Sequence, residues 1–491
     1  MLLLKKGNPC LKANRDLITI FIQSYSAYKL MSLERFFNPK SIAVIGASRT
    51  PGKIGYETLK NTLVYDYKGK MYPVNPNADE ILGQKCYPNV KAVRDKIDLA
   101  LIVVPAEMVP GILEECGKKK IKNAVIVSSG FIEIGEKKLA ENILLIAKKY
   151  GIRILGPNTM GFKNPVDGLD ASFVFGMPYK GSISVVSQSG ALSIGVIYHA
   201  LLEKIGLSKV IGMGNKLDID DADIIEYLEK DPSTKVIAMY IEDVKNGKKF
   251  LSAAKKCSKP IVVIKAGKTK AGAKAVSSHT GAMAGSDKIY DGVFKQADII
   301  RVNDVTELFD VSNALANQPP ARGNRVGIIS NGGGAGILLA DACSDNDLEV
   351  PYLNNYTVKK LKKILPPLVT PGNPVDLVAD AGFHRYEMAT KAVLEDKNID
   401  GVIVTCVHGG YARPREYTGA VLKMVELQRN DPKHDKPIIS CWIGGREIEE
   451  VTEDLKNENI PVYQDTTRAV NAMKALVKEG YRLGLHSRRI K

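Results

Sequence analysis

The sequence predicts an α/β protein in which several parallel sheets are each covered by helices on both faces. Short, continuously apolar segments alternate with helix-forming segments along most of the 491 residues. Such segments are typical of parallel strands buried on both sides. Turns rich in Gly, Ser, Pro or Asn follow most of them. Because the length corresponds to about three domains, we expect three such sheets.

The first unit is predicted over residues 31–163 and is similar to a Rossmann domain. The 30 residues before it carry five basic side chains and one acidic, and we interpret them as a disordered or non-native extension. Five apolar strands are expected, each ending in a turn: Ser41–Ile45, Lys70–Val74, Asp98–Val104, Asn123–Val127 and Ile152–Leu155.

Two further units, both similar to flavodoxin-like domains, are predicted over residues 164–318 and 325–481. The stretch that contains Pro165, Gly168, Gly176 and Pro178 is interpreted as a linker, and so is the Pro-rich segment 317–324. Both units open with a strand that enters a Gly/Ser turn and then a helix. A basic tail, residues 482–491, ends the chain. The remaining expected strands are Ser182–Val186, Lys209–Met213, Val236–Ile241, Pro260–Lys265, Arg325–Ser330, Gly401–Cys406, Pro437–Trp442 and Pro461–Tyr463.

Composition excludes several classes of protein. Hydrophobic residues at 45% and charged residues at 25% argue against a disordered or collagen-like chain. No apolar run approaches the ~18 residues of a membrane helix, and the run at residues 17–22 is too short for a signal peptide. Seven cysteines without a C-x-x-C pair suggest no metal site and a reduced, cytoplasmic protein.

The net charge of +15 suggests anionic partners. Aromatic residues make up only 7% of the chain, and no basic and aromatic residues interleave as in base-stacking proteins. The basic residues are spread out, and the extension and the tail hold a large share of the excess. We therefore expect small phosphorylated ligands rather than nucleic acid.

A glycine-rich turn after the first strand is the first candidate binding motif. It reads Gly46-Ala47-Ser48-Arg49-Thr50-Pro51-Gly52-Lys53-Ile54-Gly55 and opens a helix, whose N-terminus favours a phosphate group. It departs from G-x-G-x-x-G, and the second strand ends in Asn75-Pro76 without an acid for a ribose hydroxyl, which disfavours NAD. Further loops at the same sheet edge carry Val104, Pro105, Ser129, Gly130 and Asn158.

A second group of motifs indicates phosphoryl chemistry. His279 lies in a run of small residues, Ser277 to Ser286, which predicts a mobile loop that carries an unhindered imidazole. Glu242 ends an apolar strand and could fix the tautomer of that imidazole. Two Gly/Ser helix starts, if aimed at one point, would hold a phosphoryl group between them: Ser187, Gln188, Ser189 and Gly190, and Asn331, Gly332, Gly333 and Gly334.

Together these residues resemble the α subunit of ADP-forming acetyl-CoA synthetase, an NDP-forming acyl-CoA synthetase of the succinyl-CoA synthetase superfamily. The resemblance covers about residues 31–480, and Ser278-His279-Thr280-Gly281-Ala282 is its most specific motif. It implies that His279 is phosphorylated and that Glu242 steadies it. It also implies that the two helix starts cradle the phosphate and that the first unit binds CoA. The residues implied near CoA are Gly46, Ala47, Ser48, Thr50, Gly52, Lys53, Ile54, Gly55, Asn75, Pro76, Val104, Pro105, Ser129, Gly130 and Asn158.

The reaction that the resemblance implies converts acyl-CoA, phosphate and ADP to acid, CoA and ATP through an acyl phosphate and a phosphohistidine. The family needs an ATP-grasp module, which this chain lacks, so a separate β subunit is expected to bind ADP or ATP with Mg²⁺. An α2β2 assembly is implied. The acyl group, the choice between ADP and GDP, and the direction of the reaction stay open.

Three alternatives remain. A CoA-binding regulatory protein of the same fold would be expected to lack His279 or Glu242, and both are present. A protein acetyltransferase relative would need a further module. A dinucleotide oxidoreductase is opposed by the altered glycine motif and by the missing acid.

Overall fold

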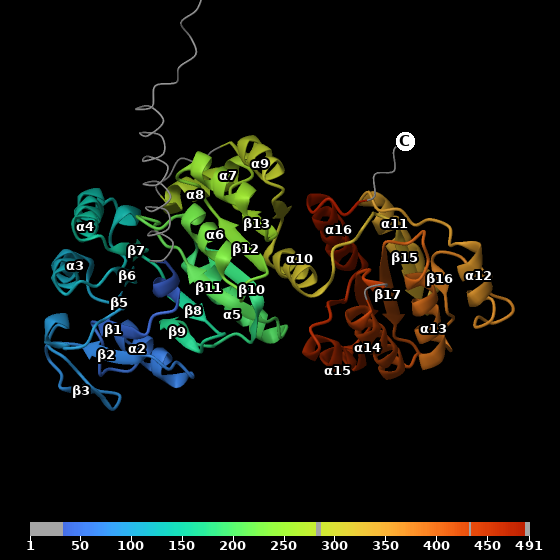
Figure 1. Cartoon of the computed structure of the whole chain (residues 1–491), viewed down its shortest axis with the longest axis horizontal. Coiled ribbons are helices and arrows are strands. Elements are labelled where there is room, and N and C mark those ends of the chain that lie inside the picture. Colours follow the sequence, from blue (N-terminus) through green and yellow to red (C-terminus); the bar gives the residue numbers. More distant parts are fainter. Residues whose placement is uncertain (1–32, 281–285, 432–433, 487–491) are drawn as a thin grey trace, which may run out of the picture.

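The computed structural model describes residues 33–280, 286–431 and 434–486. Three mainly parallel sheets follow one another along the chain, and helices pack on the faces of each (Figure 1). The α/β class expected from the sequence is confirmed. The extension expected at residues 1–30 lies outside the described residues, as do residues 281–285.

The first sheet has the strand order β2-β1-β5-β6-β7, and all of its pairs are parallel. A short helical segment at residues 33–37 precedes it, and Leu33, Phe36 and Phe37 there are buried. The ordered fold therefore includes the segment just before the first strand. The elements are β1 (Ser41–Ile45), α2 (Ile54–Val64), β2 (Lys70–Val74), the small hairpin β3 (Glu80–Ile81) and β4 (Gln84–Lys85), β5 (Leu99–Ile102), α3 (Val109–Lys118), β6 (Asn123–Ile126), α4 (Lys137–Tyr150) and β7 (Arg153–Leu155).

The second sheet has the order β14-β13-β12-β10-β11-β8-β9. Strand β11 lies on one side of β10 and strand β12 on the other, so the order of the strands switches at β10. The loops that follow the neighbouring strands β10 and β12 therefore lie side by side at the carboxyl edge of the sheet. The elements are β8 (Gly161–Asn164), β9 (Leu169–Ser172), β10 (Lys180–Ser187), α5 (Gly190–Leu202), β11 (Leu207–Gly212), α6 (Asp221–Lys230), β12 (Val236–Ile241), α7 (Gly247–Lys256), β13 (Ile261–Lys265), α8 (Lys270–Thr280), α9 (Asp287–Gln296), β14 (Ile300–Val302) and α10 (Val305–Asn317).

The linker interpretation of residues 164–178 is wrong for most of that stretch. Strands β8 and β9 form an antiparallel hairpin, and β8 pairs with β11, so the hairpin extends the second sheet. Lys163 and Asp170 form an ion pair with no exposure to solvent. In the sequence, two charged residues in a short segment suggest a solvated loop. Here Lys163 and Asp170 neutralise each other inside the protein, and that pairing exists only in the folded chain.

The third sheet has the order β16-β15-β17-β18-β19 and is also parallel. Strands β14 and β16 are short edge strands that the sequence did not predict. The elements are β15 (Val326–Ser330), α11 (Gly333–Asp345), α12 (Asn355–Leu361), β16 (Val375–Asp376), α13 (Phe383–Leu394), β17 (Gly401–Val407), α14 (Pro414–Asn430), β18 (Ile438–Ile443), α15 (Arg446–Asn457), β19 (Val462–Tyr463) and α16 (Thr466–Arg482).

The first two sheets share an interface that shapes the cavity described below. The loop after β11 donates backbone hydrogen bonds across it, from Asn215 N to Pro157 O at 2.9 Å and from Leu217 N to Gly156 O at 3.0 Å. Arg153 reaches Asp218 at 2.8 Å and Asp223 at 3.1 Å. One buried hydrophobic cluster continues through both units. These contacts place the loops of the first sheet against those of the second.

The third unit meets the second through helices α10 and α16, as Figure 1 shows. Arg468 on α16 forms two hydrogen bonds to Asp310 on α10, at 2.7 and 2.8 Å. Helix α16 extends to Arg482, which pairs with Glu479 and donates to the carbonyl oxygen of Ser258. The predicted basic tail therefore begins one residue inside an anchored helix, because Arg482 has folded partners, the buried Glu479 among them, that a sequence does not reveal.

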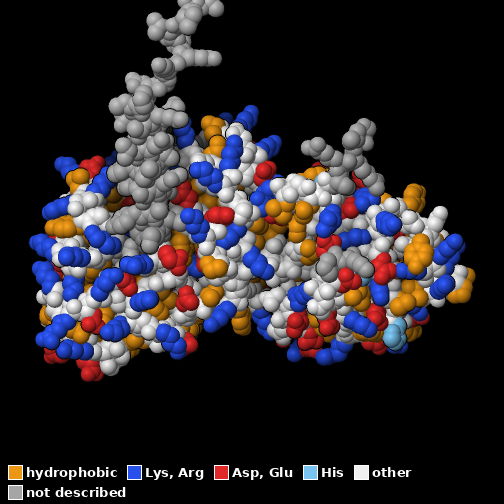
Figure 2. Space-filling model, viewed as in Figure 1, with side chains coloured by type: hydrophobic (Ala, Val, Ile, Leu, Met, Phe, Trp, Pro, Cys, Tyr) orange, Lys and Arg blue, Asp and Glu red, His pale blue; other side chains and the backbone are white. Residues whose placement is uncertain are grey.

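Acidic side chains lie between the basic ones over much of the face drawn in Figure 2. This mixture agrees with the expectation that the excess of positive charge is spread along the chain. In the part of the chain that the structure describes, no helix has both the length and the apolar character needed to cross a membrane. The six cysteines of that part are buried and unpaired with one another.

Candidate active site between the first two sheets

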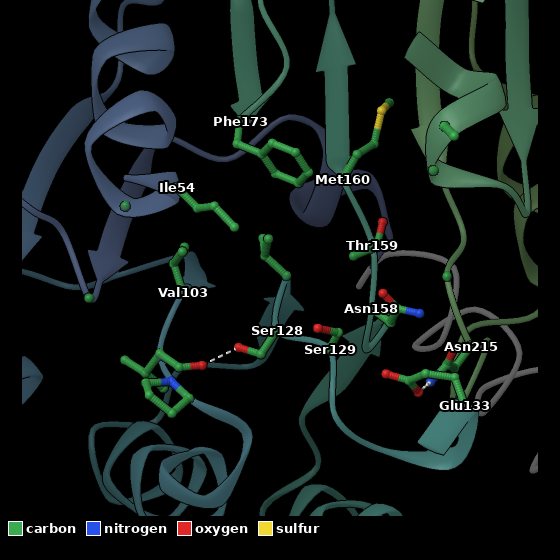
Figure 3. A pocket seen from close by; sticks show the side chains of 18 of the residues that line it. Ile54, Val103, Ser128, Ser129, Glu133, Asn158, Thr159, Met160, Phe173 and Asn215 are labelled. Atoms are coloured by element: carbon green, nitrogen blue, oxygen red, sulfur yellow. Dashed lines mark hydrogen bonds between the residues drawn. The ribbon is translucent and has the colours of Figure 1, made fainter. Parts of the chain in front are cut away.

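A cavity of about 1500 Å³ lies where the carboxyl edges of the first and second sheets meet (Figure 3). Loops after β1, β5, β6 and β7 form one side, and the loops after β10, β11 and β12 form the other. Most of the predicted site residues of these two units line it: Gly46, Ala47, Ser48, Gly52, Lys53, Ile54, Gly55, Asn75, Val104, Pro105, Ser129, Asn158, Gln188, Ser189, Gly190 and Glu242. Thr50, Pro76, Gly130 and Ser187 are not in the described lining.

The glycine-rich turn after β1 is packed too closely for larger residues at two positions. Gly46 has a φ of +92°, and a Cβ on it would lie 2.2 Å from the carbonyl oxygen of Val103. A Cβ on Gly55 would lie 2.0 Å from the carbonyl oxygen of Gly46. The N-terminal turn of α2 therefore sits directly against the end of β1. This geometry brings a helix N-terminus, which favours anions, to the cavity wall.

Asn75 has a structural role at the end of β2, where a dinucleotide enzyme would carry an acid. Its Nδ2 donates to the carbonyl oxygen of Ala47 at 2.7 Å, and its Oδ1 accepts from Asn77 N at 2.8 Å. The amide thus ties the β2 loop to the glycine-rich turn. A carboxylate could accept the second bond but could not donate the first.

The 187–190 turn, which joins β10 to α5, presents the start of that helix to the cavity. Ser189 is the N-cap and accepts from Leu192 N at 3.3 Å. The Ser187 hydroxyl donates to the carbonyl oxygen of Ser189 at 2.9 Å, and this hydrogen bond holds the turn in place. The positive end of the α5 dipole therefore faces the cavity, where it favours a phosphate group.

Gln188 links this turn to the end of β12. Its Oε1 accepts from the backbone N–H groups of Glu242 at 3.0 Å and Asp243 at 3.2 Å. Its Nε2 donates to the Asp243 carboxylate. A single amide side chain therefore sets the position of the backbone that carries Glu242 relative to the α5 N-terminus.

Glu242 lines the cavity while retaining only 4% exposure. Tyr240, two residues earlier on β12, donates a hydrogen bond to its carboxylate. Burial together with this negative neighbour raises the pKa of Tyr240 to about 12. A carboxylate fixed in this way can accept a hydrogen bond from an imidazole and so set which ring nitrogen is free.

His279 lies on helix α8, which begins at Lys270 and ends at Thr280. The expectation of a loop is therefore wrong for residues 277–280, while 281–285 fall outside the described residues. Thr269 accepts from Gly272 N at 3.1 Å at the helix start, and alanine and lysine fill the next turns. Alanine and lysine favour a helix, and the helix that they start continues into the small residues for which a loop was expected.

The 331–334 turn, the second predicted helix start, makes its described contacts within the third unit. Asn331 accepts from Val407 N at 2.7 Å and donates to Val407 O at 2.9 Å. Gly332 is the N-cap of α11. Residues Asn331, Gly332, Gly333 and Gly334 are absent from the described lining of the cavity. In this structure, the two turns thus do not share the cavity.

A buried cation beneath the cavity was not predicted. Lys216 has no exposed side-chain surface and reaches Asp221 at 2.9 Å, the Asp243 carboxylate at 3.1 Å and Gln188 Oε1 at 3.1 Å. Burial opposes its charge, but the two carboxylates outweigh burial and raise the pKa of Lys216 above its usual value. The same lysine helps to hold the pKa of Asp243 below its usual value against the effect of burial.

Other polar residues of the cavity lining are also held by hydrogen bonds. Asn215 donates to Glu133 at 2.6 Å, and the other carboxylate oxygen of Glu133 accepts from Gly130 N at 2.6 Å. Lys245 donates to the carbonyl oxygens of Asn215 and Lys216. Nothing in the sequence indicated these residues, because each lies in a short segment without a motif. Within the described residues, no group of His, Cys, Asp or Glu side chains is arranged to hold a metal ion.

Three family models match the chain in succession. Residues 40–165 match a CoA binding domain, residues 180–315 a succinyl-CoA ligase like flavodoxin domain, and residues 326–486 a ligase-CoA domain. Fold and site thus define the class: a ligase chain of the succinyl-CoA synthetase type.

Similar proteins narrow this class. The α subunit of acetate–CoA ligase [ADP-forming] I from Pyrococcus furiosus is 43% identical over 91% of this chain and 98% of its own length. Acetate–CoA ligase [ADP-forming] from Methanocaldococcus jannaschii is also 43% identical, over 90% of this chain but only 62% of its own length. The chain belongs to the family of ADP-forming acetate–CoA ligases, and it corresponds to their α subunit.

A solved structure agrees with this assignment. The dinucleotide-forming acetyl-coenzyme A synthetase 1 of Candidatus Korarchaeum cryptofilum, solved in complex with phosphate and ADP, matches with a TM-score of 0.88 and 38% identity. The match covers 92% of this chain and 98% of that one.

Proposed function

We propose that this chain catalyses the CoA-dependent half of an ADP-forming acyl-CoA ligase reaction, in the cytoplasm, and passes a phosphoryl group to a separate ATP-grasp β subunit. The supporting observation is that one cavity joins the CoA-type loops of the first sheet to the α5 N-terminus and Glu242. An acyl thioester placed along the first set of loops would have its carbonyl beside a site suited to phosphate.

The proposed reaction has three balanced steps. Inorganic phosphate attacks the acyl-CoA carbonyl, and CoA leaves as the thiol while an acyl phosphate forms. A ring nitrogen of His279 attacks the phosphorus, and the carboxylate leaves. ADP, held with Mg²⁺ on the β subunit, then takes the phosphoryl group and becomes ATP. Covalent catalysis splits the transfer into two easier steps.

Each residue of this chain has one task in the proposal. The α2 N-terminus with Gly46, Ser48 and Lys53 binds CoA phosphates, together with Ala47, Thr50, Gly52, Ile54, Gly55, Asn75, Pro76, Val104, Pro105, Ser129, Gly130 and Asn158 along the ligand. The α5 N-terminus at Ser187, Gln188, Ser189 and Gly190 binds phosphate. Glu242 orients His279. Asn331, Gly332, Gly333 and Gly334 are proposed to contact the phosphohistidine in another arrangement of the subunits.

The relatives support a two-chain enzyme. The Pyrococcus protein is named as an α subunit, and the Methanocaldococcus protein extends well beyond the part that this chain matches. We propose that the equivalent of that further part is the β subunit and that the assembly is α2β2. Co-purification with a co-expressed β chain, followed by light scattering, tests the stoichiometry.

Phosphorylation of the purified chain tests the mechanism. With acetyl-CoA and ³²P-phosphate, the chain together with its β partner is expected to acquire acid-labile, base-stable label. His279→Ala is expected to abolish the label and Glu242→Gln to reduce it. His384→Ala serves as the control, because that histidine is 91% exposed on the third unit. Label that survives in His279→Ala would refute the mechanism, and CoA binding without label in the wild type would favour a regulatory protein.

A further inference from the structure

The cavity contains an apolar wall between its two helix N-termini. Ile54 is the first residue of α2, and Ile194 lies in the second turn of α5. Val103, Met160 and Phe173 complete the wall. In Figure 3, the Phe173 ring extends into the space between Ile54 and Met160.

Three of the charged side chains that line the cavity are engaged by other protein groups, and Lys53 is assigned to CoA phosphates in the proposed function. Glu133 binds Asn215, Asp243 binds Gln188 and Lys216, and Lys245 binds backbone carbonyls. In Figure 3, Glu133 and Asn215 lie away from Phe173, beyond Ser129 and Asn158. A neutral hydrocarbon group therefore suits the wall better than a second carboxylate would, because a buried charge needs a partner.

The backbone on either side of Phe173 is fixed by buried polar groups. Asn61 on α2 donates to the carbonyl oxygens of Ser172 and Val174, each at 3.1 Å. Lys163 donates to Val174 O at 2.6 Å and pairs with Asp170. Neither Lys163 nor Asp170 is exposed. Such a network cannot relax easily when a bulky group presses on the ring, so Phe173 can act as a fixed limit.

We propose that Phe173 is the specificity-determining residue for the acyl group and restricts it to a short, uncharged aliphatic chain. This inference rests on the proposed function. An acyl carbonyl placed beside the α5 N-terminus has its substituent against the wall, and the ring closes the space in which a longer chain would continue. Removing the ring opens that space without changing the loops assigned to CoA.

The test compares Phe173→Ala with Phe175→Ala. Phe175 lies two residues away on the same segment but is 68% exposed, so it is a matched control. Affinities of the full chain for CoA, acetyl-CoA, isovaleryl-CoA and phenylacetyl-CoA are measured by titration calorimetry. We expect F173A to raise the affinity for the two larger thioesters, relative to acetyl-CoA, by about 10-fold or more. CoA affinity should remain within about 2-fold of the wild type, and F175A should change nothing.

Turnover with the β partner separates this inference from the proposed function. A wild-type enzyme that turns over acetyl-CoA, with a selectivity that F173A leaves unchanged, would overturn the inference and leave the function intact. Absence of phosphohistidine in the wild type would overturn the function, while the calorimetric comparison would still decide whether Phe173 limits the acyl group. If F173A fails to fold, Phe173→Leu carries the same comparison with a smaller expected shift. Equal affinity for succinyl-CoA and butyryl-CoA would contradict the preference for an uncharged chain.

Discussion

Replacing Lys216 with methionine should destabilise the second unit strongly, because it removes the cation from a buried cluster. The lysine side chain is fully buried, and Asp221 is 3% exposed. Removing one partner of such a pair leaves an uncompensated buried charge, which costs about 3–5 kcal/mol. For a domain of this size, that cost corresponds to a fall in Tm of roughly 6–20 °C.

The effect should depend on pH in a defined direction. Burial already raises the pKa of Asp221, although Lys216 attracts its charged form. Without Lys216 that pKa rises further, and the protonated carboxyl is much less costly to bury. A raised folded-state pKa favours the folded state at low pH, so the difference between wild type and Lys216→Met should shrink as the pH falls from 8 to 5.

Thermal unfolding followed by circular dichroism measures both effects. Lys248→Met is the control, because that lysine is exposed and on the neighbouring helix α7. Adding Asp221→Asn to Lys216→Met should recover part of the lost stability, because it removes one of the two orphaned carboxylates. An unchanged Tm, or a difference that grows at lower pH, would refute the assignment of Lys216 as the neutralising cation.

Three further changes have defined outcomes. Gly46→Ala should cost about 1–3 kcal/mol more in unfolding free energy than Gly52→Ala, because both residues have positive φ but a Cβ clashes only at Gly46; equal losses in urea titrations would contradict this. Asp231→Asn should destabilise at pH 7 and progressively less as the pH falls below 3.8, because burial is outweighed by hydrogen bonds that hold the pKa of Asp231 below that usual value, and its stabilisation is lost as the pH falls through the folded-state value; a difference that does not shrink in acid would argue against it. Arg468→Met should lose about 1.5–3 kcal/mol, since it removes two hydrogen bonds to Asp310, and should speed proteolysis at residues 317–324; unchanged cleavage would show that this ion pair does not hold the units together.

The sequence predicted the central strands well because burial on both faces leaves a local signature. The bounds of β1, β2 and β12 match the expected segments, and each is a run of mainly apolar residues. Strands β14 and β16 have three and two residues, so their pairing comes from neighbouring strands rather than from their own pattern. Their existence could be known only from the assembled sheets.

Much of the cavity could be predicted, since glycine-rich turns at strand ends mark one edge of a parallel sheet. Lys216 and Phe173 could not be found in this way. A lysine in a loop is usually solvated, and its burial here depends on Asp221 and Asp243 arriving from other segments. Phe173 follows a strand that was interpreted as a linker, so its approach to α2 and α5 had no sequence signal.

The turn between the first parallel strand and the following helix has the same contacts in the second and third units. Aligning the two turns shows which residue of the third unit corresponds to Glu242. Ser187 donates to the carbonyl oxygen of the α5 N-cap, and Ser330 does the same at the α11 N-cap. Ser187 is in register with Tyr240 on β12, and Ser330 with Thr405 on β17. Glu242 lies two residues after Tyr240, and Val407 lies two residues after Thr405. Val407 is therefore the counterpart of Glu242.

The side-chain contacts support this alignment independently of the strand register. Gln188 accepts from the N–H of Glu242, and Asn331 accepts from the N–H of Val407. The fold therefore keeps the helix N-terminus and the amide clamp in both units, but only the second unit has a carboxylate at the position of Glu242; in the third unit Asp376, at the end of β16, lies beside Gly333 instead. A helix start with N–H groups alone can bind a phosphate, whereas orienting an imidazole also needs an acceptor. In the proposed mechanism, Glu242 accordingly orients His279 at the second unit, and the α11 N-terminus of the third unit contributes anion binding.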